Sequence, residues 1–165
     1  MLITDVASGE GLVPAGQWYV ATDQVMGGVS EGGAVVEHVE GRAALRLTGE
    51  VSSANNGGFL LLGCRFGREV DASGFGGLEV DVRGVGGGYV LSLRTADLSR
   101  PWQSYRAPLE AGDGAWHRMT VPFSAFTANK TDAPLNPTRL TRLAIVATEK
   151  DAPADVALSR VAFID

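Results

Sequence analysis

The stretch GLEVDVRG at residues 77–84 decides the fold class, because its side chains alternate between apolar and charged. Successive side chains of a β-strand point to opposite faces, so the alternation predicts a strand with Leu78, Val80 and Val82 inward. Glycine clusters flank the stretch, at 74–77 and 84–88, and indicate turns. We therefore predict a half-buried strand at this point of the chain.

Similar patterns recur on both sides of this strand. Alternation predicts further strands at residues 43–51, 88–95 and 116–123, and a strand at 17–21 precedes them. The runs 57–66 and 140–148 are almost wholly apolar, which is typical of strands covered on both faces. In the last run, 155–165, the pattern changes phase between Leu158 and Val161 and indicates a β-bulge. Residues 124–139 lack a pattern and are predicted to form a surface loop, with one helical turn after Phe123.

Glycine supports an all-β fold. The chain of 165 residues contains 22 glycines, whereas an average composition of ~7% would give about 12. They separate short apolar runs, and no segment shows a helical period over ten or more residues. We count about nine to ten strands, a number typical of a two-sheet β-sandwich. The prediction is one all-β domain over residues 1–165, without linker or internal repeat.

The amino-acid composition excludes several kinds of site. A single cysteine, Cys64, excludes an intramolecular disulfide and a thiolate zinc cage, and two histidines are too few for a dedicated imidazole site. The net charge of −5 disfavours a general nucleic-acid or anionic-membrane surface, although the arginine-rich segment 94–148 admits a local basic face. The sequence shows neither ~18 consecutive apolar residues nor a signal-peptide pattern, so we expect a cytoplasmic protein.

Signals for catalysis or cofactors are weak. The glycine clusters lack the GxGxxG spacing and the following helix of a dinucleotide site, and no nucleophile-elbow motif is present. Asp5 and Asp165 could share a calcium ion if the terminal strands pair, but two carboxylates fall short of the ~6–8 oxygens that calcium prefers. Solvated terminal acids are the favoured interpretation. We therefore expect a non-enzymatic protein without a cofactor.

The densest motif is WYVATDQVMGGVS at residues 18–30. As turn chemistry, Asp23 would cap backbone amides, and Gly27 and Gly28 would allow positive φ. Met26 is harder to explain as part of a turn. An exposed methionine is an adaptable apolar contact, which suits a surface that docks another protein.

A second candidate surface lies at residues 102–106. A strand here would set Trp102, Ser104 and Arg106 on one side, and Gln103 with Tyr105 on the other. Aromatic rings, amides and arginine can stack on sugars, bases or the side chains of a partner. Such aromatics are as often part of a packing rim, so both interpretations stay open.

The order of several motifs resembles the complex I intermediate-associated protein 30 family over about residues 15–165. The motifs are Trp18, DQVMGGVS (23–30), NGGF (56–59), VRG (82–84), Tyr89, Leu93-Arg94, Tyr105, Trp116, VPF (121–123) and Phe126. The resemblance implies a galactose-binding-like jelly-roll sandwich and a binding or assembly role without catalysis, since mitochondrial members look like chaperones of complex I assembly. Residues 127–137 and 154–158 depart from the family pattern.

The leading hypothesis is a protein-binding domain that acts in the assembly of a respiratory membrane complex. Its contact surface would be the loop 23–30 and the turn 55–59, namely Asp23, Met26, Gly27, Gly28, Ser30, Asn55, Asn56, Gly57, Gly58 and Phe59. Asp23 and Ser30 would hold the loop through hydrogen bonds to backbone, and Met26 would touch the partner.

Two other hypotheses use the second candidate surface. Carbohydrate would bind to Trp102, Tyr105, Arg94 and Asn55 by ring stacking and amide hydrogen bonds, with Arg106 on the same face. RNA would instead contact the arginine-rich segment 94–142, with Tyr105 and Trp102 as stacking platforms.

Overall fold

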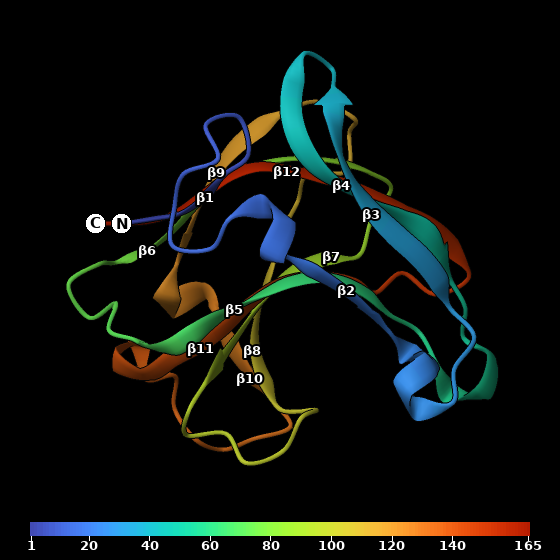
Figure 1. Cartoon of the computed structure of the whole chain (residues 1–165). Helices are drawn as coiled ribbons and strands as arrows, with labels where there is room; N and C mark the ends of the chain where they lie inside the picture. Colours follow the sequence, from blue (N-terminus) through green and yellow to red (C-terminus); the bar gives the residue numbers. More distant parts are fainter.

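The computed structural model describes residues 1–165, except for the side chains of Val25, Met26 and Asn56. The chain forms β-strands joined by turns and by short 3-10 helices. The strands build two antiparallel six-stranded sheets that pack face to face (Figure 1). This arrangement confirms the predicted all-β, two-sheet sandwich.

The first sheet has the order β3-β4-β12-β6-β9, with β1 also paired to β12. Its strands are β1 (Leu2–Asp5), β3 (Glu31–Val39), β4 (Arg42–Val51), β6 (Gly77–Val85), β9 (His117–Pro122) and β12 (Ala152–Ile164). The pairing of β12 with β6 shifts register between Leu158 and Arg160, which confirms the predicted change of phase. At this shift the inward side of the strand changes from even-numbered to odd-numbered positions, so that Leu158, Val161 and Phe163 are all buried.

The second sheet has the order β10-β8-β7-β11-β5-β2. Its strands are β2 (Tyr19–Thr22), β5 (Leu60–Val70), β7 (Tyr89–Thr95), β8 (Ser104–Pro108), β10 (Thr127–Asn129) and β11 (Leu140–Ala147). The 3-10 helices are η1 (Ala15–Gln17), η2 (Asp23–Met26), η3 (Ala54–Asn56), η4 (Phe123–Ala125) and η5 (Pro137–Arg139). The helical turn expected after Phe123 is η4, which begins at that residue. Strand β10 interrupts the predicted loop 124–139, because three residues are too few to show a period of two.

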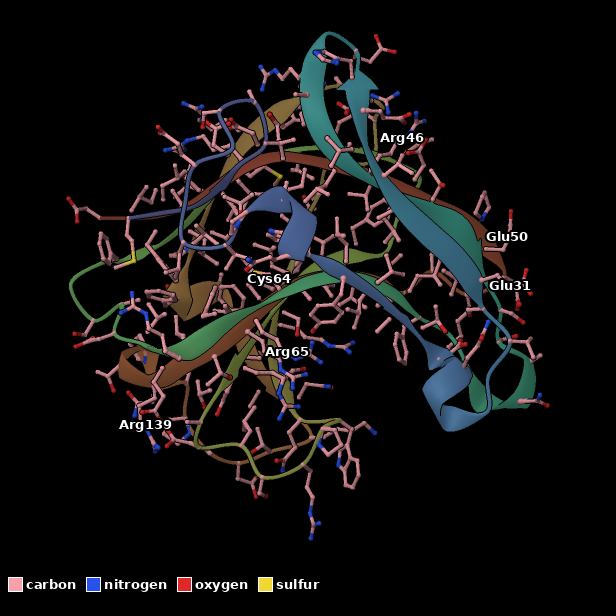
Figure 2. All side chains as sticks on the ribbon, in the orientation of Figure 1. Glu31, Arg46, Glu50, Cys64, Arg65 and Arg139 are labelled. Atoms are coloured by element: carbon pink, nitrogen blue, oxygen red, sulfur yellow. The ribbon has the colours of Figure 1, made fainter. Side chains whose placement is uncertain are left out.

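The core lies between the two sheets. Leu78, Val80 and Val82 of β6 are fully buried, as their alternation predicts. In the second sheet, neighbouring residues of β5 point to opposite faces, with Cys64 in the core and Arg65 on the outside (Figure 2). The outer face of this second sheet therefore carries its own set of side chains, and the site described below is built there.

The two ends of the chain lie side by side (Figure 1), and the amino terminus donates a hydrogen bond of 3.0 Å to the carbonyl of Phe163. Strands β1 and β12 are antiparallel, so Asp5 lies opposite Arg160, five residues before Asp165. The less favoured possibility, a calcium ion shared by Asp5 and Asp165, is not supported, because the pairing of the terminal strands places Asp5 opposite Arg160 and not beside Asp165. Among the described side chains, no three His, Cys, Asp or Glu residues gather as metal ligands.

Candidate functional site

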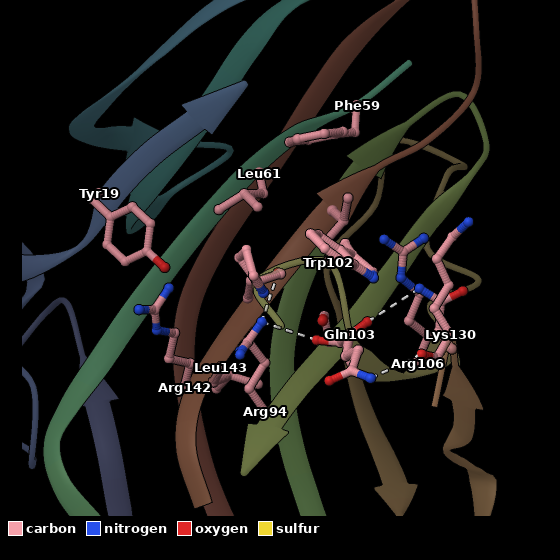
Figure 3. Close-up of a pocket in the computed structure, with 16 residues that line it drawn as sticks. Tyr19, Phe59, Leu61, Arg94, Trp102, Gln103, Arg106, Lys130, Arg142 and Leu143 are labelled. Atoms are coloured by element: carbon pink, nitrogen blue, oxygen red, sulfur yellow. Dashed lines mark hydrogen bonds between the residues drawn. The ribbon is translucent and has the colours of Figure 1, made fainter. Parts of the chain in front are cut away.

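The outer face of the second sheet is hollowed into a groove of about 750 Å³ (Figure 3). Its lining combines aromatic, aliphatic, amide and cationic side chains. The residues that line it are Tyr19, Phe59, Leu61, Ser92, Arg94, Pro101, Trp102, Gln103, Ser104, Arg106, Asn129, Lys130, Arg142, Leu143, Ala144 and Val146. Such a mixture of apolar surface and a few polar groups is typical of a ligand site.

The strand register orders the floor of the groove in three rows that cross the strands. Residues two apart on a strand share a face, so neighbouring rows differ by two positions. The rows are Arg65–Arg142–Arg94, then Tyr19–Gly63–Ala144–Ser92–Arg106, then Leu61–Val146–Val90. The first row is cationic and the third is aliphatic. This explains why the run 140–148 is mostly apolar, since Ala144 and Val146 are buried on the outer face of the sheet.

One side of the groove is formed by Tyr19. Its ring lies over Gly63, where an added Cβ would come within 3.2 Å of the ring and of the Cβ of Ala144. The guanidinium of Arg65 lies 4.4 Å from the centre of the Tyr19 ring, in a cation–π contact. Glycine at position 63 therefore makes room for the aromatic side of the groove.

The opposite side is formed by Trp102, Gln103 and Lys130 (Figure 3). Arg94 fixes this loop by donating hydrogen bonds to the carbonyls of Arg100, Pro101 and Gln103, at 3.0, 2.6 and 3.1 Å. The side-chain amide of Gln103 donates to the carbonyl of Lys130 at 3.2 Å. Trp102 remains 57% exposed, so its ring is free to contact a ligand.

The structure brings together Arg94, Trp102 and Arg106 of the second candidate surface, but Tyr105 and Asn55 do not line the groove. Tyr105 is 1% exposed and its hydroxyl donates to the carbonyls of Ala133 and Pro134, at 2.9 and 3.2 Å. Its assignment as a stacking residue is therefore wrong, because alternation along β8 turns Tyr105 into the core. Burial raises the pKa of this phenol. The aromatic residue across the groove from Trp102 is Tyr19 instead.

The groove is electropositive. Among the described side chains that line it there is no carboxylate, whereas Arg94, Arg106, Lys130 and Arg142 all contribute to it. Burial lowers the pKa of Arg94, and the nearby charge of Arg142 lowers it further. The Nε of Arg106 is buried without a hydrogen-bond partner among the described residues, and burial lowers the pKa of its guanidinium too. A buried donor without an acceptor is unfavourable. The guanidinium as a whole is half-buried and lines the groove, where it is suited to pair with an anionic group of a ligand.

A second feature adjoins the groove, where the loop 23–30 meets the turn 52–59. Asp23 is fully buried, and it accepts hydrogen bonds from Ser30 N at 2.9 Å, Gly58 N at 2.6 Å, Phe59 N at 3.3 Å and the hydroxyl of Ser30. Burial alone would raise the pKa of this carboxyl, but these hydrogen bonds together hold it below its ordinary value. Asp23 and Ser30 therefore join the two segments from the inside and do not form an outer contact surface.

The glycines of this region have different roles. Gly27 ends η2 with φ +86°, a left-handed conformation that favours glycine. Gly28 does not have positive φ; an added Cβ there would lie 2.5 Å from the carboxyl carbon of Asp23. The prediction of positive φ is thus right for Gly27 and wrong for Gly28, where close approach of the carboxylate requires glycine.

Gly57 also approaches the carboxylate closely, since its added Cβ would lie 2.4 Å from Oδ2 of Asp23. Gly58 has φ +144°, and Asn55 is exposed with φ +55°. The proposed contacts of Met26 and Asn56 fall on side chains outside the described residues. The backbone N–H of Asp23 donates to the carbonyl of Phe59, and the N–H of Phe59 donates to the Asp23 carboxylate. These bonds bring the two predicted segments together at one end of the groove, which Phe59 lines.

Several groove residues were not singled out from the sequence. Tyr19 and Arg142 lie on strands that are distant in sequence from residues 102–106 and meet them only through the register of the sheet. Asn129 and Lys130 belong to the stretch that showed no pattern. The excess of arginine in the segment 94–148 predicted a local basic face, which covers Lys130 and Arg142. Tyr19 lies outside this segment, and no signal assigned it to a ligand surface.

This fold and its hollowed sheet place the chain among the jelly-roll β-sandwiches that include carbohydrate-binding modules. It resembles the family 11 carbohydrate-binding module from Clostridium thermocellum in complex with a beta-1,3-1,4-mixed-linked tetrasaccharide, with TM-score 0.70 and 9% identity over 90% of this chain and 88% of that one. It also resembles a family 30 carbohydrate-binding module, with TM-score 0.63 and 16% identity over 88% of this chain and 91% of that one. At these identities the likeness shows the fold alone.

The sequence identifies the family more closely. Residues 10–159 match the model of complex I intermediate-associated protein 30, and the chain belongs to that family. No curated protein matches the sequence. Across the described part of the chain, no helix has the length and apolar character to cross a membrane.

Proposed function

We propose that this chain is a non-catalytic binding domain that acts in the assembly of a respiratory complex related to complex I. The groove on the second sheet would hold part of a protein partner, and the exposed residues of the adjoining loop 23–30 and turn 55–59 would extend the contact surface. The family supports the assembly role. The observation that carries the binding role is the groove itself, whose exposed Trp102, apolar floor and unpaired cations resemble a recognition surface.

The lining of the groove also supports binding rather than catalysis. The side chains that most often act as general acids and bases are imidazoles and carboxylates, and the described lining contains neither. Cys64 lies in the core on the opposite side of β5, away from the groove. The groups that do line the groove hold and orient a ligand, which is the task of a binding domain.

Affinity purification of the tagged full chain from its host cells, followed by mass spectrometry, tests this function. We expect respiratory-complex subunits or their assembly factors to co-elute with the wild-type chain. They should be depleted with Trp102→Ala combined with Arg106→Gln, and retained with Arg42→Gln on the first sheet. Failure to recover any respiratory-complex protein, or equal recovery with the groove variant, would contradict the proposal.

Carbohydrate binding is a second candidate, favoured by one observation. Trp102 and Tyr19 present aromatic rings on two sides of a groove that also carries the amides of Gln103 and Asn129, and rings with amides are a common way to hold a sugar. Titration of the mixed-linked tetrasaccharide, followed by tryptophan fluorescence, tests it. A spectrum that does not change would exclude this sugar as a ligand.

A further inference from the structure

Three arginines lie directly beside one another on the outer face of the second sheet, where Arg94 and Arg142 line the groove and Arg65 adjoins it. In the register of the second sheet, Arg142 of β11 is paired with Arg65 of β5 on one side and with Arg94 of β7 on the other. Like charges directly opposite each other destabilise a sheet. The carbonyls that accept from Arg94 and the Tyr19 ring beside Arg65 offset this repulsion in part, but no carboxylate among the described residues neutralises the row.

The other sheet shows how the same chain neutralises arginine elsewhere. On its outer face, each arginine that we name here is paired with a carboxylate: Arg46 with Asp155 at 2.8 Å and Glu37 at 3.0 Å, Arg118 with Asp81 at 2.7 Å, and Arg160 with Glu79 at 2.9 Å. Within the described residues, Arg65, Arg94 and Arg142 make no such pair, and Arg106 and Lys130 make none either. The chain has more Asp and Glu than Lys and Arg, with a net charge of −5. The described lining of the groove nevertheless contains no carboxylate.

The neutralising groups are therefore expected to come from a ligand. Arginine forms paired, planar hydrogen bonds with carboxylate or phosphate, and both classes of anion fit the charge of the row. The net negative charge of the rest of the chain distinguishes between a long polyanion and a short acidic segment as the ligand. A long polyanion would extend beyond the groove over a chain of net negative charge, whereas a short acidic segment would stay within it.

The floor of the groove also favours a peptide. Single-stranded nucleic acid is held on successive aromatic platforms. Here the rings of Tyr19 and Trp102 lie on opposite sides of the groove and not in succession, and the row that faces the arginines is aliphatic, with Leu61, Val146 and Val90. A peptide that crosses the strands between these rows would direct alternate side chains toward cations on one side and toward aliphatic groups on the other.

We propose that the groove binds an extended peptide segment of a partner protein in which acidic and apolar side chains alternate. Its carboxylates would pair with the arginine row and Arg106, and its apolar side chains would cover Leu61, Ala144 and Val146. This inference rests on the proposed function, because it names the kind of partner segment that the binding domain would hold.

A direct titration tests the ligand class. The probes are a short peptide of alternating glutamate and leucine and its counterpart of alternating lysine and leucine, each added to the full chain and followed by calorimetry and tryptophan fluorescence. The net charge of −5 would attract the lysine peptide, so preference for the glutamate peptide can come only from the groove. Binding should weaken steeply between ~0.01 and ~1 M salt, as the Debye length falls from ~30 to ~3 Å.

Matched variants locate the site. Arg106→Gln and Arg142→Gln should each weaken binding of the glutamate peptide about tenfold, the effect of losing one charge-assisted hydrogen bond. Arg42→Gln changes the net charge equally, but its guanidinium packs on Trp116 and Arg42 belongs to the first sheet, so it should leave binding unchanged. Arg142→Gln should also keep or raise the melting temperature, because it relieves repulsion within the row.

Several results would overturn the inference: no binding of the glutamate peptide at low salt, equal loss with Arg42→Gln, or a marked fall in stability with Arg142→Gln. Tighter binding of oligouridylate or of the mixed-linked tetrasaccharide than of the glutamate peptide would also overturn it. If the peptide fails while respiratory-complex proteins still co-elute with the tagged chain, the ligand class is wrong and the proposed function stands. Loss of co-elution with peptide binding intact would contradict the proposed function alone.

Discussion

Replacement of Asp23 by asparagine tests whether the buried carboxylate holds the loop 23–30 and the turn 52–59 together. The substitution keeps the size of the side chain and removes its charge and one of its two acceptor oxygens. The carboxylate now accepts four hydrogen bonds, from the amides of Ser30, Gly58 and Phe59 and from the hydroxyl of Ser30. Whichever way the new amide is oriented, at least one backbone N–H will face an NH2 group.

The size of the effect follows from these contacts. A hydrogen bond to a charged group contributes ~1.5–3 kcal/mol, and a buried donor left without an acceptor costs ~1–3 kcal/mol. The lost bond and its unpaired donor are the same event, so we take the upper end of these ranges and expect the free energy of unfolding to fall by about 3 kcal/mol. For a domain of this size the melting temperature should fall by ~6–12 °C, at ~2–4 °C for each kcal/mol.

The pH dependence gives a second, independent measurement. The pKa of Asp23 lies below its ordinary value of 3.8 in the folded chain, since hydrogen bonds outweigh burial. A carboxyl with a depressed pKa stabilises the fold above its unfolded pKa, and this contribution is lost as the pH falls through the folded pKa. The difference between wild type and Asp23→Asn should therefore be largest near neutral pH and shrink below pH ~4.

Urea unfolding at pH ~7 and pH ~3 measures both effects, with an unchanged m-value as the sign that the unfolded state is comparable. Asp132→Asn is the matched control, because Asp132 is exposed and its carboxylate has no hydrogen-bond partner among the described residues. The control should stay within ~0.5 kcal/mol of wild type. A loss below ~1 kcal/mol for Asp23→Asn at neutral pH, or a difference that does not shrink in acid, would refute the structural role of this carboxylate.

Three further predictions concern other positions. Gly28→Ala should lower the free energy of unfolding, measured in urea, by ~1–3 kcal/mol, because the added Cβ would lie 2.5 Å from the carboxyl carbon of Asp23. Gly33→Ala is the control and should stay within ~0.5 kcal/mol of wild type, because its added Cβ has nothing within 4 Å. Equal effects of the two substitutions would contradict this explanation. Trp102→Ala should leave the melting temperature unchanged, since the ring is exposed, and should weaken binding of the glutamate peptide about tenfold. A large fall in melting temperature would show instead that the ring packs against the fold. Burial raises the pKa of Cys64 to about 12, so a thiol reagent at pH ~8 should react slowly with the folded chain and rapidly in urea; fast labelling without urea would show that the core around this thiol is accessible.

The sequence was informative wherever the signal is local. Alternation in residues 77–84 predicted both the strand β6 and its buried side, since side-chain direction in a strand depends only on position. The motif at 23–30 predicted that Asp23 and Ser30 would hold a loop, because capping of nearby amides is chemistry within a few residues. Strands β1, β3 and β10 were not predicted, because none of their sequences shows a sustained alternation between apolar and polar residues.

The groove could not be read from the sequence with the same success. Tyr105 was assigned to the ligand face because aromatic composition indicates recognition, yet only the position of β8 within the sheet decides which of its sides faces the core. Arg65, Arg94 and Arg142 are far apart in the chain, and nothing local relates them. Their alignment depends on how β5, β11 and β7 pair.

What the sequence determined by itself was the all-β class, the inward faces of its longer strands and the chemistry of the loop 23–30, because each depends on neighbours along the chain. The tertiary structure alone decided that Asp23 joins two separate segments, that Tyr19 lies across the groove from Trp102, and that three arginines share one row. The physical reason is that pairing between distant strands is selected by burial of the whole core. The same strand pairing decides which side chains lie next to one another on the outer face, where the ligand would bind.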